Sequence, residues 1–596
     1  MTLNKIVILI DVICFFTIVC SLTQKTLLPY AYIFAVVIMA VLLALSLVKN
    51  SGHTKIVILQ IFLIFFLTRN IYYLSTQNFI PFADAYWDYA VEKTFWEQGR
   101  IFVIHGVVRP TEVAGISQLT WYSGWPLLHS LGFVFCRVSG IDPFYLNWIL
   151  PQFFNLISFA FVYLLFEKLR VRLSLRKEIT ILALLIYATA PEAIFWQIQF
   201  VRQGLALALL GPILYLLCFS ISGPFDRRYD MILRILALFI VVTHHFTAFT
   251  LTLFLILLSA IKVIANNLGK GKRSNRFFSS FGKTSFISLG LLVFVFMFIW
   301  WEQYGFVVLP TIESRIDLFI ENLREWGVDS SVLASFSYPS SLRPMWVTPL
   351  LGSRDLMMYA PALMGLLLLW SEKSRIPEKF FVVYSVLAFG AIFIIYDAFL
   401  ALEPLRIILL MMPFLAFLSS LFYYRILGLS RTIGKTILFI IVILFVLASF
   451  TGLWAHNFAP VHLYDPSVNP VSVGEGTPSF TRLKPFFENK INFTNIENVR
   501  ADVISRLVYL MDPDDYDKIK SLPTQNLNQL STKNSLICSF KDLNLYVYYG
   551  YIWSPIETVE EAETLQHELR QYLSDNSNYI YNDGSNSIWA TLNDTW

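Results

Sequence analysis

The sequence predicts a mainly α-helical protein: a polytopic membrane bundle of about 13 spans, followed by a small extracytoplasmic α/β domain. Three observations support this fold class. Of the 596 residues, 56% are hydrophobic and 14% are charged, with a mean hydropathy of +0.61, whereas soluble proteins carry about 25% charged residues. Apolar stretches of about 20 residues, the length that crosses a bilayer, recur through residues 1–454. From Ala455 to Trp596, ten basic and 18 acidic residues give a net charge of −8, against +12 for the preceding part.

This composition excludes a soluble globular enzyme, a disordered protein and a nucleic-acid-binding protein. The five cysteines form no disulfide framework, because only Cys538 lies in the acidic tail, and they show no zinc spacing. The first apolar stretch, Ile6 to Leu22, is followed at once by others. We therefore interpret it as the first membrane anchor and not as a cleaved signal peptide.

Thirteen spans are predicted from the apolar stretches. A shorter fourteenth candidate, 125–139, is interrupted by His129. The predicted spans cover roughly 5–23, 28–48, 55–76, 144–166, 178–197, 202–222, 232–245, 246–264, 284–301, 356–371, 380–397, 405–424 and 435–454.

The basic residues predict the orientation of the bundle, because Lys and Arg accumulate in short cytoplasmic loops. If 125–139 lies in the outer interface without crossing, every basic cluster faces the cytoplasm. The N-terminus is then cytoplasmic, and the tail 455–596 is extracytoplasmic, as are the loops 78–143 and 302–355. The clusters are 168–177, 227–234, 262–283, 373–379 and 425–435.

The tail, 455–596, has the signals of one small α/β domain. Strands are expected at 535–540 and 544–551, and a helix at 558–573, where Thr558 and Glu561 fit a capping box. The segments 579–583 and 587–592 flank Gly584 and predict a closing hairpin.

An acidic and aromatic segment follows the third predicted span. Asp84, Asp88 and Glu92 are spaced by four residues, so a helix places them on one face. One interpretation is a solvated acidic face on a helix lying in the membrane interface. The other is that one carboxylate acts at the membrane surface as a general base.

Several short motifs resemble the GT-C superfamily of polytopic glycosyltransferases. Asp84-x-Tyr86-Trp87-x-Tyr89 ending at Gly99 is similar to a segment of the oligosaccharyltransferase catalytic subunit, and protein mannosyltransferases are distantly alike. The further motifs run from Trp121 to His129, from Ala190-Pro191-Glu192 to Arg202, and from Glu403-Pro404-Leu-Arg406 to Pro413. Trp300-Trp301-Glu302-Gln303-Tyr304-Gly305 resembles an acceptor motif of that enzyme but ends a span, so we interpret it as an interfacial anchor.

The resemblance implies a multi-pass enzyme of the cell membrane. It would move a sugar or glycan from a polyprenyl (dolichyl) phosphate carrier to a glycan, lipid or protein acceptor on the extracytoplasmic face. Asp84 matches the position of the superfamily's catalytic aspartate, with Asp88 beside it. Asp88 departs from the oligosaccharyltransferase pattern. Acceptor or pocket residues would be Tyr86, Glu92, Tyr122 and Glu192.

Four cationic or titratable residues at predicted outer helix ends are candidates for binding the donor phosphate. Arg406 is the first choice, because a guanidinium suits phosphate, and Arg202, His244 and His245 follow. Each arginine has an alternative interpretation as an interfacial anchor, and the two histidines as a polar turn. A divalent metal, Mg or Mn, is compatible with carboxylates beside a phosphate. Glu192 is the second carboxylate that such a site would use.

A transporter or flippase of lipid-linked saccharides is the alternative function. Transporters carry paired repeats and broken helices near the bilayer midplane, whereas the charges of this sequence gather at the predicted outer boundary. A structural or receptor-like protein would leave the acidic face at 84–97 unexplained. The sequence therefore favours the enzyme.

Overall fold

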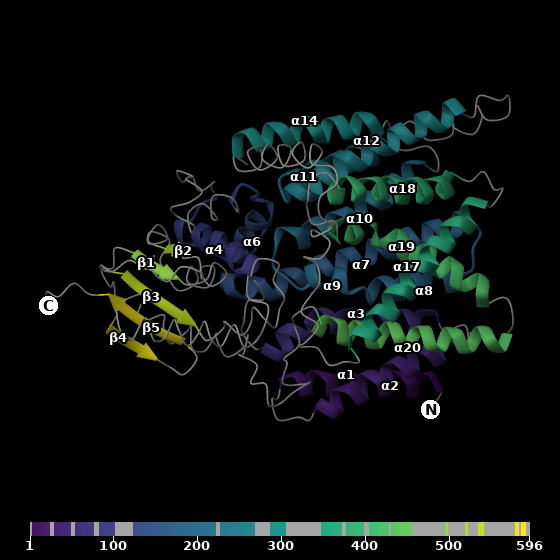
Figure 1. Ribbon diagram of the computed structural model, residues 1–596, viewed down its shortest axis with the longest axis horizontal. Helices are drawn as coiled ribbons and strands as arrows, with labels where there is room; N and C mark the ends of the chain where they lie inside the picture. Colours follow the sequence, from purple (N-terminus) through teal and green to yellow (C-terminus); the bar gives the residue numbers. More distant parts are fainter. Residues whose placement is uncertain are drawn as a thin grey trace, which may run out of the picture.

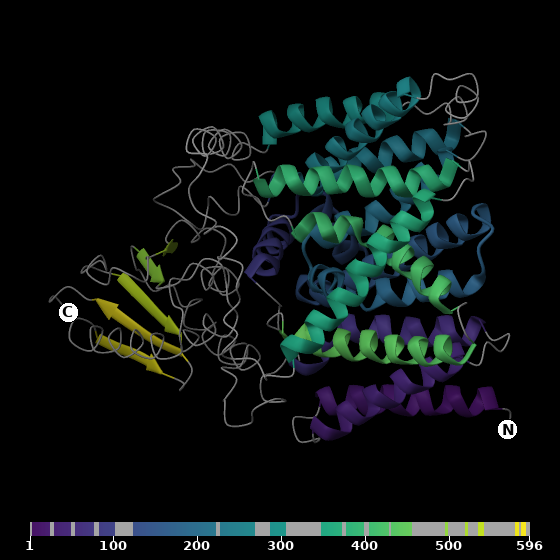
Figure 2. The same ribbon diagram turned by 45° about the vertical axis from the view of Figure 1, so that its right-hand side comes forward.

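The computed structural model describes a helical bundle and five strands. Figures 1 and 2 show the helices running side by side, with the strands beyond one end of the bundle. The described residues are 3–23, 29–48, 54–76, 83–101, 123–221, 227–268, 286–304, 347–371, 377–398, 405–427, 431–455 and the strands 495–498, 519–521, 535–540, 578–582 and 586–591.

The helices follow the predicted spans closely. The N-terminal half contains α1 (Leu3–Thr23), α2 (Pro29–Val48), α3 (Thr54–Thr76), α4 (Ala83–Gln98), α6 (Leu127–Ser139), a 3₁₀ turn η1 (Pro143–Tyr145), α7 (Leu146–Arg172), α8 (Lys177–Ala188), α9 (Pro191–Gln197), α10 (Arg202–Ile221), α11 (Arg227–Val241) and α12 (His245–Leu268). After these come α14 (Phe286–Tyr304), α17 (Val347–Ser371), α18 (Pro377–Ala398), α19 (Leu405–Leu427) and α20 (Arg431–Ala455).

Five helices of the described part are long and apolar enough to cross a membrane. They are Pro143–Arg172, Arg202–Ile221, Phe286–Tyr304, Pro377–Tyr396 and Arg406–Arg425, and shorter apolar helices lie within α1, α2, α6, α12 and α20. By their length and composition these helices fit a multi-pass membrane protein, and the number of about 13 spans stays a prediction. α6 has 13 residues, fewer than the roughly 20 that a crossing needs.

The span predicted over 178–197 is not one continuous helix, so this prediction is wrong. The stretch 178–197 divides into α8 and the seven-residue α9, with Ala190 extended at φ −74° and ψ 111° between them. Pro191 explains the break, because a proline disfavours helical geometry at the residue before it and suits the first position of a new helix.

Close backbone approach holds the centre of the bundle. α17 and α19 pack at Gly365, where a side chain would meet the backbone carbonyl of Leu418. Ser419 Oγ donates to the carbonyl of Met358 at 2.6 Å across the same contact. A glycine is therefore required at this point for the two helices to touch.

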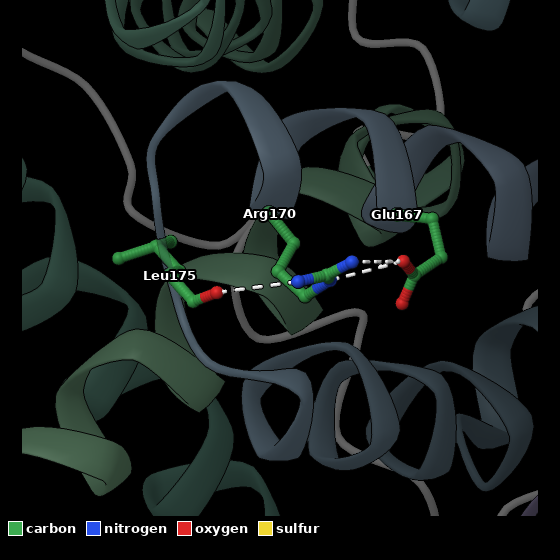
Figure 3. Close-up of polar contacts among 3 residues, drawn as sticks. All are labelled: Glu167, Arg170 and Leu175. Atoms are coloured by element: carbon green, nitrogen blue, oxygen red, sulfur yellow. Dashed lines mark hydrogen bonds and ion pairs between the residues drawn. The ribbon is translucent and has the colours of Figure 1, made fainter. Parts of the chain in front are cut away.

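The turn between α7 and α8 is held by one arginine (Figure 3). Arg170 donates to Glu167 Oε2 from Nε at 2.9 Å and from Nη2 at 2.8 Å, and its Nη1 donates to the carbonyl of Leu175 at 3.5 Å. Ser174 takes the left-handed φ of 52° that reverses the chain. Because α7 is 27 residues long, this turn lies about 40 Å along the helix from α6.

The five strands form one mixed sheet with the order β2-β1-β3-β5-β4. β1 (Asn495–Asn498) is parallel to β2 (Ile519–Ser521) and β3 (Ser535–Phe540). β5 (Asn586–Thr591) is antiparallel to β3 and β4 (Asn578–Asn582). β3 matches the predicted strand, and β4 and β5 form the predicted pair. The predicted strand 544–551 and helix 558–573 lie outside the described residues.

Candidate functional site

Two carboxyl groups of α4 face the protein interior. Asp88 and Glu92, one turn apart, are both fully buried, whereas Glu97 is exposed and pairs with Lys93 at 3.7 Å. The interpretation of this face as solvated is therefore wrong for Asp88 and Glu92. Figure 1 shows why: α4 and α6 lie together at the end of the bundle nearest the sheet, where α4 packs against α6.

Asp88 is held by groups from two other helices. Its Oδ1 lies 3.0 Å from Nε of Arg202 at the start of α10 and 3.3 Å from Nε2 of His129 in α6. Its Oδ2 accepts the backbone N–H of Arg202 at 3.4 Å. A carboxylate is favoured at this place by the positive end of the α10 dipole. The structure thus brings together two predicted site residues, Asp88 and Arg202, and adds His129.

An aromatic contact extends this cluster toward the two histidines. The guanidinium of Arg202 lies 5.4 Å from the ring centre of Trp125, and the Trp125 ring lies 4.8 Å from that of His245. The turn that carries Trp125 is fixed by Trp300, whose Nε1 donates to the carbonyl of Gly124 at 2.9 Å. Trp300 therefore makes a specific contact within the protein beyond the expected role as an anchor.

The two adjacent histidines lie ring to ring at the start of α12. His244 precedes α12 and its Nδ1 lies 3.0 Å from the hydroxyl of Thr247, and the rings of His244 and His245 lie 4.9 Å apart. Burial lowers the pKa of His244 well below 6.5, and the nearby His245, Arg202 and Arg406 lower it further. His244 is therefore neutral at neutral pH and can accept or donate a hydrogen bond.

Arg406 completes the cluster from α19. Its guanidinium lies 4.7 Å from the ring centre of Trp196 in α9 and 5.4 Å from that of Phe246 in α12. A guanidinium can make planar, two-point contacts with a phosphate. The Phe246 ring in turn lies 6.4 Å from the ring of His244, which connects Arg406 to the two histidines.

The α8–α9 break is stabilised by Arg69, which the sequence analysis did not select. Arg69 is fully buried in α3 and donates to the carbonyl of Ala188 at 2.5 Å and to Gln197 Oε1 at 2.8 and 3.0 Å. It thus satisfies a carbonyl at the end of α8 and fixes the residue next to Trp196. A charge inside a predicted span was the available signal.

Four predicted site residues are described in part or not at all. Asp84 and Tyr86 lie in α4 and Glu192 in α9, but their side chains are outside the described set, as is all of Tyr122. Within the described residues, His, Cys, Asp and Glu side chains form no group of three that could hold a metal ion. A Mg or Mn site built with Asp84 and Glu192 stays a prediction.

The described part of the site can neutralise and orient anionic groups. Asp88 and Arg202 compensate each other, His244 is a neutral donor or acceptor, and Arg406 is a cation on an aromatic support. The elements that carry them, α4, α6, α10, α12 and α19, are far apart in sequence. The bundle brings these predicted residues into one connected cluster.

Comparisons with known proteins give fold neighbours only. No family model and no curated protein matches the chain. Among solved structures, ArnT from Cupriavidus metallidurans bound to undecaprenyl phosphate is 10% identical, with a TM-score of 0.47, over 91% of this chain and 99% of that one. The Archaeoglobus fulgidus oligosaccharyltransferase, in a structure with a tethered acceptor peptide, is 11% identical to this chain. Its TM-score is 0.43, and the match covers 89% of this chain and 73% of that one. Its apo form is 12% identical, with a TM-score of 0.45, over 92% and 76%.

Proposed function

We propose that the protein is a membrane glycosyltransferase that moves a sugar or glycan from a polyprenyl (dolichyl) phosphate carrier to an acceptor on the extracytoplasmic face. The observation that carries the proposal is the buried Asp88–Arg202 pair, which fixes the acidic helix α4 to the start of α10. A buried charge pair is costly to desolvate, so the presence of this one between α4 and α10 favours a functional site.

In this proposal, Asp84 takes the proton from the acceptor. Asp88 positions Asp84 by holding the helix α4 that carries it. Asp84 lies one helical turn before Asp88 in α4. Because Asp88 is bound by Arg202 and His129, its carboxylate is committed to holding α4. A general base of this kind increases the rate of a transfer by about 10²–10⁴-fold.

Arg406 is the proposed contact for the donor phosphate, with His244 as a neutral hydrogen-bonding neighbour. The rings of Trp196 and Phe246 support the guanidinium, which limits its motion and lowers the entropy lost on binding. Arg202 adds positive potential to the site. Its side chain pairs with Asp88, and its backbone N–H donates to the same carboxylate. The glycan, lipid or protein acceptor would contact Tyr86, Tyr122 and Glu192, three of the predicted acceptor or pocket residues.

The proposal is tested with the purified protein in liposomes that contain a radiolabelled polyprenyl-phosphate sugar. We expect label to leave the lipid in the presence of membrane extract as a source of acceptor, and the Asp84→Asn protein to leave it in place. A transporter would instead move a fluorescent polyprenyl-phosphate sugar between leaflets without breaking its bond to phosphate. Movement without cleavage in both proteins would contradict the enzyme and support the alternative.

A further inference from the structure

Glu92 occupies an unusual place between α4 and α6. Asp88 lies against His129, with 3.3 Å between carboxyl and imidazole, and one turn later Glu92 lies against Gly132. A Cβ added to Gly132 would come within 2.6 Å of Glu92 Oε2 and 2.8 Å of its Cδ. The two helices therefore meet along successive turns, and the space for the Glu92 carboxyl exists only because residue 132 has no side chain.

The Glu92 carboxyl has no hydrogen-bond partner among the described residues. Both of its oxygens are buried, and the side chain is 0% exposed. A buried carboxylate without partners is so unfavourable that the group binds a proton instead. Consistent with this geometry, burial raises the pKa of Glu92 well above 4.5.

The groups around this contact do not compensate a negative charge on Glu92. Lys93 pairs with Glu97, Arg137 donates to the Trp96 carbonyl at 2.9 Å, and Arg202 pairs with Asp88. The described titratable and charged side chains on α4, α6 and η1, on the residues that flank them and at the start of α10 are Asp88, Tyr89, Lys93, Glu97, Arg100, His129, Cys136, Arg137, Asp142, Tyr145 and Arg202.

We propose that Glu92 is a positioning residue that holds Asp88 against His129 and Arg202 only while its own carboxyl is protonated. Ionised Glu92 must acquire water, and α4 has to move away from Gly132 to admit it. Asp88 lies one turn away on the same face, so this movement separates it from His129 and Arg202. The kinetic consequence rests on the proposed function, whereas the protonation and the helix movement do not.

The sign of the pH dependence follows from the raised pKa. The stabilising effect of neutral Glu92 is full below the unfolded-state pKa near 4.5 and is lost as the pH rises through the raised pKa of the folded protein. Transfer by the wild-type protein should therefore fall by about tenfold for each pH unit above that pKa, as for any single required protonated group.

The first two measurements need no transfer activity. Infrared spectra of the detergent-solubilised protein at neutral pH should contain the carbonyl band of a protonated carboxyl, and Glu92→Gln should remove it. Hydrogen exchange of α4 peptides should increase with pH more steeply in the wild type than in Glu92→Gln. The control Glu97→Gln, an exposed position on the same helix, should behave as the wild type in both.

An infrared band unchanged by Glu92→Gln, or equal pH dependence of α4 exchange in both proteins, would overturn the proposal. If Glu92→Gln does not fold, Glu92→Met is tested in its place, because a neutral side chain of similar length should be tolerated at this position. Failure of Glu92→Met to fold would also overturn the proposal. In transfer assays, Glu92→Gln should keep activity at a pH where the wild type has lost it. If no protein transfers sugar, the proposed function fails, while infrared and exchange still decide the role of Glu92.

Discussion

Arg202 Nε lies 3.0 Å from Asp88 Oδ1, although the two residues are 114 positions apart in the chain. Both side chains are almost completely buried. This pair joins the first residue of α10 to the middle of α4. It therefore ties α4, the helix after α3, to the helices of the bundle. The acidic helix is therefore a fixed part of the protein and not a loosely attached interfacial element.

Asp88→Asn should destabilise the protein as well as lower its activity. The amide keeps the size of the side chain but leaves Arg202 without the charge it pairs with, and breaking a buried pair costs about 3–5 kcal/mol. Thermal unfolding of the detergent-solubilised protein measures this loss. Asp88→Asn combined with Arg202→Gln should cost less than the two single changes added together, because the two sites are coupled. Additive losses would show that the pair contributes no coupling.

Arg406→Ala should weaken use of the donor while leaving the fold intact. Loss of a charge-assisted contact to phosphate corresponds to an increase in donor KM of about 10- to 100-fold. Arg406→Lys should recover part of this, since lysine keeps the charge but not the planar geometry. The matched control is Arg425→Ala at the other end of α19. An unchanged donor KM in Arg406→Ala would make Arg406 an anchor only.

The helices were predictable from sequence because their apolar stretches are long, and one exception shows the limit. The break at Ala190 separates α8 from α9, yet apolar residues continue across it. The signal was Pro191, whose effect on the preceding residue is local. What stabilises the break, the buried Arg69 and its bonds to Ala188 and Gln197, depends on a helix more than 100 residues earlier.

The candidate site was predicted as separate residues but not as contacts. The four-residue spacing placed Asp88 and Glu92 on one face of a helix, and the sequence could not decide whether that face meets water or protein. In the sequence, His129 interrupts an apolar stretch and ends the motif that begins at Trp121, and neither feature predicts a contact with Asp88. Its contact with Asp88 results from the packing of α4 on α6, which tertiary structure alone determines. β1 and β2 were missed for a similar reason, since strands of three or four residues carry no periodic pattern.

The orientation in the membrane can be tested at two described positions. Ser139 ends α6 and Ser174 lies in the α7–α8 turn, both exposed, at opposite ends of α7. In a background with the exposed Cys20 and the tail residue Cys538 both replaced by Ser, Ser139→Cys should react with an impermeant thiol reagent in intact cells. Ser174→Cys should react only after permeabilisation, because basic loops stay cytoplasmic. The reverse labelling would place α4 and the site on the cytoplasmic side.

Asp84→Asn should abolish transfer without the loss of stability expected for Asp88→Asn. An amide is nearly the same size as the carboxylate but cannot accept the acceptor's proton, so the rate should fall by about 10²–10⁴-fold. Unfolding temperature and membrane insertion should stay at wild-type values, since Asp84 is proposed to act on the acceptor and not to hold α4.

The contrast between these two aspartates separates chemistry from positioning. Glu97→Gln, exposed at the end of the same helix, should be almost silent in both assays. If Asp84→Asn and Asp88→Asn each remove all activity and the double variant is no worse, the two carboxylates act as one unit. A fully active Asp84→Asn protein would contradict the general-base assignment. The transporter would then be the better explanation, because moving a lipid-linked sugar across the membrane requires no proton acceptor at this position.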